Sequence, residues 1–440
     1  MPVPSRLRRL LTAALPAVAA VALTACNADY PNSIFHSHTE FNREVDYLFK
    51  ILIWLGTAVF IFVEGLLVVA MLRFRRKSDD DRPKHVHGNT TLEILWTAIP
   101  ALILVFIAVP TVRTIFRTQA KAKADALQVE VVGHQWWWEF RYPQYKITTA
   151  NELYLPLGRT VNFTLRTQDV LHSFWIPQMG GKRDLIANHP NYLWFTPDSV
   201  GEMAWNGFCV EYCGASHANM RFRSFTVTPA QFESWAQHQA APAVFGAVAA
   251  PGAAGATAPA AAAAPAAAGA APPAAAPSAG PSATPVPPAT APAPDGATVQ
   301  QAGFVAFPRE RMPAHTVPRT PLPGGLRYND ALVGDAKRGS TLIMPCAGCH
   351  MINGNPVMMG VIGPNLTHIG SRSTIGGGLF PNDTRHLARW IKNARAMKPG
   401  ILMPTLGKGE TDPVTKAVVP AAGLTDEQIA DIVAYLQALK

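Results

Sequence analysis

Two long apolar segments near the start of the chain restrict its fold more than any other feature. They cover residues 47–72 and 92–112, and each is close to the ~20 residues that a helix needs to cross a bilayer. Apolar residues make up 48% of the 440 residues and charged residues 15%, which also favours membrane content. We therefore expect a two-helix membrane hairpin followed by domains outside the bilayer.

The short loop between these segments is rich in basic residues, at 73–77 and again at Arg82 and Lys84. Loops of this kind stay on the cytoplasmic side of a membrane. Both ends of the hairpin, and all of the chain after it, are therefore predicted to face outward. The net charge of +9 is thus explained by membrane topology, and since no nucleic-acid motif accompanies it, we expect no nucleic-acid partner.

The first residues of the chain predict export from a bacterial cytoplasm. A basic start with three arginines precedes the apolar stretch 10–22, which is too short to cross a bilayer. Leu23-Thr24-Ala25-Cys26 resembles a lipoprotein cleavage site, so residues 1–25 are predicted to be a signal peptide and Cys26 a lipid anchor. The alternative is an uncleaved signal with an incidental Cys26. Either reading gives a multi-pass protein of the bacterial inner membrane with its domains on the outer face.

Two acidic residues interrupt the apolar segments. Glu64 lies inside the first and Glu93 opens the second. A carboxylate in a membrane helix is a functional candidate by default. For Glu93 there is a structural alternative, because acidic residues favour helix N-termini. Glu64 has no assigned role.

Residues 126–228 carry the pattern of short strands. Val161, Phe163 and Leu165 alternate with polar residues, which is the period of a half-buried strand. Further strands are expected at 127–132, 136–142, 152–155 and 221–227, and a helix at 229–239 with proline in its first turn. This spacing predicts an all-β sandwich or barrel.

Metal-binding side chains gather in one short segment of this region. It contains Cys209, Cys213, His217 and Met220, and His172 lies on an earlier predicted strand. Soft sulfur with imidazole suits copper or zinc, and a thioether favours copper. The alternative is a disulfide between the two cysteines, since exported cysteines usually oxidise. The histidine and methionine in the same loop favour the metal.

Together these motifs resemble subunit II of cytochrome c oxidase over residues 41–239. The resemblance rests on the segments 92–97, 133–138, 169–174 and 209–220. It implies a cupredoxin-like Greek-key barrel that holds a binuclear copper centre, CuA. It also implies the role of each ligand. Cys209 and Cys213 would be bridging thiolates, and His172 and His217 terminal imidazoles. Met220 would be a weak axial thioether ligand, with the Glu211 backbone carbonyl opposite to it.

The same resemblance implies three further roles. The Glu211 side chain would reach a magnesium ion shared with subunit I, and Glu93 would lie at the mouth of a proton-uptake path. Trp136 would be the surface aromatic residue where electrons enter, although three consecutive tryptophans cannot all face one side of a strand, so a core position is the alternative. Residues 186–189 depart from a Pro-Gly-Arg-like turn of many relatives, a difference that concerns the contact with subunit I.

Residues 240–297 consist almost entirely of alanine, proline, glycine, serine and threonine. Such a segment cannot bury a core and is predicted to be disordered. As a random coil its ends would be roughly 40–45 Å apart, so it forms a tether. Residues 304–323 remain rich in proline but gain charge, and are expected to run along a surface.

Cys346-Ala347-Gly348-Cys349-His350 is the C-x-x-C-H pattern of covalent haem attachment. It predicts two thioether bonds from Cys346 and Cys349, with His350 as an axial haem ligand. The alternative, a redox disulfide beside a chance histidine, suits a cytoplasmic thioredoxin-like unit better than an exported chain.

The last domain resembles class I cytochromes c, which are all-α proteins. The segment 398–404 resembles their sixth-ligand loop and makes Met403 the preferred second haem ligand over Met358, Met359 and Met397. A histidine–methionine pair raises the haem potential. A helix is expected at 335–344, and a capping box at 425–428 opens a second helix.

The expected chain is therefore multidomain: signal peptide 1–25, hairpin 26–118, copper domain 119–239, Ala/Pro linker 240–326 and cytochrome domain 327–440. This order resembles subunit II of caa-type cytochrome c oxidases. It implies electron transfer from haem c to CuA and on to subunit I, which reduces oxygen and pumps protons. It also implies oxidase subunits I and III, membrane lipid and an external donor, either cytochrome c or a membrane reductase complex, as partners.

Two rival functions share part of this pattern. A nitrous-oxide reductase module has the copper loop but lacks the hairpin with the 92–97 motif. A copper-storage or assembly protein has no need of a haem domain. A quinol-oxidase subunit is excluded if Cys209 and Cys213 bind copper.

Overall fold

The computed structural model describes residues 32–75, 78, 87–120, 122, 124–198, 201–243 and 306–440. The predicted signal peptide, Cys26 and most of the linker lie outside the described residues.

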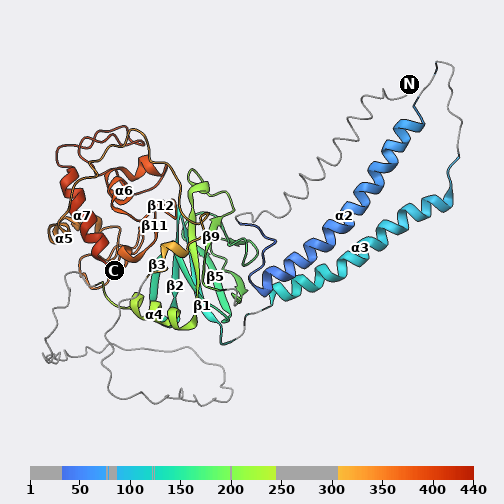
Figure 1. Cartoon of the computed structure of the whole chain (residues 1–440), viewed down its shortest axis with the longest axis horizontal. Coiled ribbons are helices and arrows are strands. Elements are labelled where there is room, and N and C mark those ends of the chain that lie inside the picture. The colour runs from blue at the N-terminus through green and yellow to red at the C-terminus, as the bar shows by residue number, and fades with distance from the viewer. Residues whose placement is uncertain are drawn as a thin grey trace, which may run out of the picture. The chain divides into compact units, whose positions relative to one another are not determined.

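Two helices, α2 (Glu40–Arg73) and α3 (Thr90–Gln119), form the predicted hairpin and lie side by side (Figure 1). Both are long and apolar enough to cross a membrane, and their apolar residues are exposed. Each begins before its apolar segment, where a polar side chain caps its first turn. Thr39 accepts a hydrogen bond from the Asn42 amide, and Asn89 accepts from the amides of Thr91 and Leu92.

The domain after the hairpin is a sandwich of two five-stranded sheets (Figure 1). The strands of the first sheet, in spatial order, are β3 (Ile147–Ala150), β2 (Trp137–Tyr142), β1 (Leu127–His134), β5 (Val161–Thr167) and β8 (Asn191–Phe195). Those of the second are β4 (Glu152–Pro156), β10 (Arg221–Val227), β9 (Met203–Cys209), β6 (His172–Trp175) and β7 (Arg183–Leu185). Most neighbours are antiparallel, but β1 pairs with β5 and β4 with β10 in parallel.

The predicted alternation in β5 is confirmed, because Val161, Phe163 and Leu165 are fully buried between the sheets. The helix α4 (Pro229–Ala240) follows β10 and begins at a capping box formed by Thr228 and Gln231. Its buried Phe232 and Trp235 contact the aromatic side chains of the first strands. The cupredoxin-like all-β domain, predicted as a Greek-key barrel, is thus present as a β-sandwich.

Residues 306–323 run along this sandwich, as expected. The ring of Phe307 is buried 5.2 Å from that of Phe225, and Arg311 forms an ion pair with Glu202. The short 3₁₀ segment η3 (Arg309–Arg311) lies between these contacts.

The last region is helical, with α5 (Ala336–Leu342), α6 (Thr384–Met397) and α7 (Asp426–Ala438), and a small hairpin of β11 (Thr374–Ile375) and β12 (Phe380–Pro381). The capping box at Thr425 and Gln428 is confirmed. The helix α5 ends earlier than the predicted 344 because Pro345 follows, and the chain continues as the 3₁₀ segment η4 (Met344–Cys346).

Helices α5 and α7 cross at Gly339. A Cβ atom there would lie 2.0 Å from the Asp431 carbonyl oxygen, so only glycine permits this approach. Arg338 fastens the same crossing by an ion pair of 2.8 Å with the Asp431 carboxylate. This crossing forms one wall of the region's hydrophobic core.

Candidate metal and haem sites

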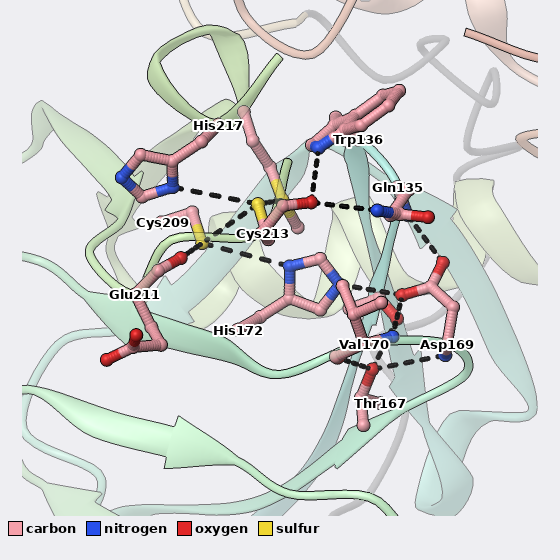
Figure 2. Close-up of polar contacts among 12 residues, drawn as sticks. Gln135, Trp136, Thr167, Asp169, Val170, His172, Cys209, Glu211, Cys213 and His217 are labelled. Carbon is pink, nitrogen blue, oxygen red and sulfur yellow. Dashed lines mark hydrogen bonds and ion pairs between the residues drawn. The ribbon is translucent and has the colours of Figure 1, made fainter. Parts of the chain in front are cut away.

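The predicted copper ligands converge at one end of the second sheet (Figure 2). Cys209 is the last residue of β9 and His172 the first of β6, its antiparallel neighbour. Their side chains meet with Cys209 Sγ 3.8 Å from His172 Nδ1. The loop after β9 turns back toward the sheet and brings Cys213 Sγ to 3.7 Å from Cys209 Sγ.

The remaining donors of the set surround the two sulfur atoms. His217 Nδ1 lies 3.6 Å and Met220 Sδ 3.9 Å from Cys213 Sγ. The Glu211 carbonyl oxygen lies 3.3 Å from Cys209 Sγ, whereas its carboxylate points away from the sulfur atoms (Figure 2). Two thiols, two imidazoles, a thioether and a carbonyl thus face one small volume, as the implied ligand set requires.

The distance between the two sulfur atoms favours the metal site over the disulfide. The two sulfur atoms are 3.7 Å apart, well beyond the roughly 2.05 Å of a covalent S–S bond, and both cysteines are free. Within the described part of the chain, His172, Cys209 and Cys213 form the one buried group whose ligand atoms lie within 4.8 Å of one another. This donor set suits soft metal ions such as copper.

His172 is oriented by a carboxylate that the sequence prediction did not include. Its Nε2 atom lies 2.8 Å from the Asp169 carboxylate, which leaves Nδ1 directed at Cys209. Burial disfavours the charged ring, but the hydrogen bonds and charges of Asp169 and Cys209 together outweigh it and raise the pKa of His172. A carboxylate behind a histidine ligand is a common way to fix its orientation.

The two thiols share a hydrogen bond. The Cys213 thiol lowers the pKa of Cys209, and the His172 imidazole acts in the same direction. The shared hydrogen bond and burial raise the pKa of Cys213. The hydrogen bond between them thus favours one thiolate in this pair, and a metal ligand needs the thiolate form.

The haem-attachment motif lines an apolar cavity. Its walls include Cys346, Cys349, His350 and Met403. His350 Nδ1 donates to the Pro364 carbonyl oxygen at 2.8 Å, so Nε2 remains for a metal. Burial lowers the pKa of His350, which favours the neutral ring that ligation requires. These residues fit a covalently bound haem.

Its position at the haem cavity distinguishes Met403 from the other three candidate methionines. Met358 is fully buried in the hydrophobic core and Met397 also belongs to that core, while Met359 is 69% exposed. Of the four, only Met403 lines the cavity. The position of Met403 is therefore compatible with its predicted role.

Trp136 is not a surface residue, contrary to the expectation for the aromatic where electrons enter. Its side chain is 8% exposed because Gly400 of the cytochrome region lies against the indole, where a Cβ atom would be 2.8 Å away. The indole Nε1 donates to the Cys213 carbonyl oxygen at 2.9 Å (Figure 2). Trp138 is the tryptophan that points into the sandwich core.

The two membrane carboxylates are exposed on their helices. Glu93 lies in the first turn of α3, which fits the favourable placement of an acid at a helix N-terminus. Glu64 lies inside α2. Neither has a described partner that defines a chemical role.

Three family models match this chain in succession. The model of the transmembrane domain of cytochrome c oxidase subunit II matches residues 34–114, and that of its periplasmic domain matches residues 144–224. The cytochrome c model matches residues 336–440.

Individual proteins are similar in the same way. Cytochrome c oxidase subunit 2 of Alkalihalophilus pseudofirmus is 28% identical over 390 residues, which cover 87% of this chain and 83% of the relative. The probable cytochrome c oxidase subunit 2 of Rickettsia bellii is 32% identical over 42% of this chain and 75% of its own length. A crystal structure of the periplasmic domain of subunit II from Bradyrhizobium japonicum is 29% identical, with a TM-score of 0.26, over 27% of this chain and 96% of that one.

These matches define a membrane-anchored bacterial component of a haem–copper oxidase. The chain belongs to the cytochrome c oxidase subunit II family and carries a C-terminal cytochrome c domain. The two domains imply CuA copper and haem c, in agreement with the donor sets described above.

Proposed function

We propose that this subunit receives electrons from an external donor and passes them to subunit I of a proton-pumping oxidase, where oxygen is reduced to water. When bound, haem c and CuA supply the one-electron redox chemistry of this transfer. The residues proposed to hold them are Cys346, Cys349, His350 and Met403 for the haem, and His172, Cys209, Glu211, Cys213, His217 and Met220 for the copper.

One observation carries this proposal. The haem cavity is lined not only by the cytochrome region but also by Gln135, Trp136 and Trp137 of the copper domain. Trp136 in turn donates a hydrogen bond to the carbonyl of Cys213, a proposed copper ligand. A single buried indole therefore contacts both sites, as a short route for electrons requires.

The protein frame suits repeated one-electron transfer. Two proposed copper ligands, His172 and Cys209, lie on strands β6 and β9, and His172 is additionally held by Asp169. A rigid frame keeps ligand geometry similar in both oxidation states. The haem cavity is lined mainly by apolar side chains, which together with a histidine–methionine pair favours a raised haem potential.

The finer assignments remain proposals of the same kind. We infer that Glu211 supplies a ligand to magnesium shared with subunit I, that Glu93 lies at the mouth of a proton path, and that subunit III and membrane lipid are further partners. We also propose the domain boundaries given above, a lipid anchor at Cys26, and a multi-pass position in the inner membrane with both redox domains outside.

Optical and EPR spectra of the purified full chain test the proposal. We expect the bands of a c-type haem and the multi-line mixed-valence signal of an electron shared by two copper ions. Cys213→Ser should abolish the copper signal and leave the haem bands intact. A single-copper pattern, or no copper signal after loading with copper, would refute the binuclear site.

A further inference from the structure

Charged side chains are buried where the copper domain meets the cytochrome region. Lys398, in the loop before Met403, is 2% exposed. Its Nζ atom donates to the Trp136 carbonyl oxygen at 2.5 Å, across the contact, and to the Gly376 carbonyl oxygen at 2.9 Å. Either protonation state of an amine donates hydrogen bonds, so this link does not require a charge.

Two charged side chains of the copper domain form hydrogen bonds with the cytochrome region. Glu152 on β4 is 4% exposed and accepts hydrogen bonds from Ser373 N at 2.6 Å and Ser373 Oγ at 2.5 Å. Arg223 on β10 is 3% exposed and donates to the Gly378 carbonyl oxygen at 3.1 Å. Separating the domains would remove these partners, although Arg223 would keep its hydrogen bonds to the Thr316 and Phe222 carbonyl oxygens.

Three consecutive glycines form the surface that meets these charges. Gly376, Gly377 and Gly378 all have positive φ angles, of 67°, 78° and 75°. A Cβ atom on Gly377 would lie 2.6 Å from Lys398 Nζ and 3.2 Å from the Trp136 carbonyl oxygen. The backbone of this glycine loop thus lies directly against the copper domain. Any residue with a side chain at these positions would prevent this close approach.

Such a contact differs from a transient electron-transfer complex. Transient complexes have small interfaces, and their charges lie mainly at a solvated rim. Burying a lysine, a glutamate and an arginine is unfavourable unless each has fixed partners. Here each has them, and they are mostly backbone groups, which cannot rotate away as long side chains do.

We propose that the cytochrome domain is locked onto the copper domain, and that Lys398 is a positioning residue which holds Trp136 between the haem and copper sites. This inference rests on the proposed electron-transfer function. The 240–326 linker would then connect the two domains without carrying the cytochrome domain between separate positions. An external donor would then deliver electrons to the cytochrome domain, because the chain's own loops cover Trp136.

The lock is tested first by cutting the linker in the assembled oxidase. A specific protease site is inserted within residues 250–300, the purified oxidase is cleaved and washed at moderate salt, and the c-type haem absorbance is measured in both fractions. We expect haem c to stay with the oxidase. Its release into the wash, while the copper signal is retained, would overturn the lock and leave the proposed function standing.

The role of Lys398 is tested by Lys398→Met in the full complex. The haem is reduced by a light flash and the arrival of the electron at copper is followed optically. We expect transfer to slow by about tenfold or more, since displacements near 1 Å strongly reduce rates that depend on geometry. Lys408→Met is the matched control, because Lys408 is an exposed lysine of the same domain, and should change nothing.

Gly377→Ala tests the same contact from the glycine loop. It provides a second variant in case Lys398→Met does not fold. It should also slow internal transfer and increase haem release after cleavage. The c-type bands and copper EPR signal of each variant report whether its sites are intact. Wild-type transfer rates in both variants, with both spectra normal, would refute the positioning role. Wild-type protein without either spectrum would instead refute the proposed function itself.

Discussion

At the scale of single residues, the carboxylate of Asp169 has a larger role than its exposed loop position indicates. It binds His172 Nε2 and also accepts hydrogen bonds from the Gln135 and Val170 amides. It therefore joins the histidine ligand to the segment that carries Trp136. The signal in the sequence was only its place three residues before a ligand histidine.

Asp169→Asn should weaken copper binding by about 10–100-fold, because an amide fixes the imidazole less well than a carboxylate. Competition with a copper chelator, followed through the EPR signal, measures this affinity. Asp125→Asn changes an exposed acid of the same domain and should leave the affinity unaltered. Equal affinities for both variants would mean that Asp169 does not support the metal site.

Met403→Leu should lower the reduction potential of the haem, since a thioether ligand stabilises the reduced iron. A potentiometric titration of the purified chain measures it. Met397→Leu is the control, because Met397 is buried in the core and does not line the cavity. If Met397→Leu lowered the potential and Met403→Leu did not, the ligand assignment would be wrong.

At the scale of elements, the α5–α7 crossing depends on the missing side chain of Gly339. Gly339→Ala should destabilise the cytochrome domain by about 1–3 kcal/mol, because the added methyl group overlaps the α7 backbone. Denaturant unfolding followed by haem absorbance gives this value. Gly325→Ala adds a methyl group in open space and should be nearly neutral. A comparable loss in both variants would argue against the close crossing.

The elements themselves were largely predictable from local patterns. Strands β1, β2, β4, β5 and β10 and helices α4 and α7 follow from alternation, proline placement and capping residues. The proposed copper ligands could be named from the sequence because most of them share one loop. The contact between the domains was not predictable, because Lys398, Glu152 and Arg223 are distant in sequence. A lysine before Pro-Gly resembles an exposed turn until its partner is known.

At the scale of the whole molecule, two histidines face each other across the domain contact. His238 on α4 and His368 have ring centroids 4.3 Å apart, and His368 Nε2 donates to the Ala241 carbonyl oxygen at 3.0 Å. Burial, and then the charge of His368, lower the pKa of His238 to about 4. Burial also lowers the pKa of His368, and the Arg372 charge adds to this.

Docking should therefore weaken in acid. Well above pH 6.5 both rings are neutral whether docked or separated, so this histidine pair adds no pH dependence there. As the pH falls from 6.5 towards 4, the separated domains bind protons that the docked form does not, so separation becomes more favourable. The fraction of haem c released after linker cleavage should rise over this range. Replacing both histidines by asparagine should flatten the dependence, whereas His189→Asn, an exposed control, should not.

The burial of Trp136 has a consequence for what electrons can meet on their way. An indole that is 8% exposed offers little contact to dissolved oxygen or peroxide. Side reactions that make partially reduced oxygen species need such contact at a reduced carrier. On the proposed electron route, the cytochrome region that covers this indole, with Gly400 against the ring, would limit such side reactions before electrons reach subunit I.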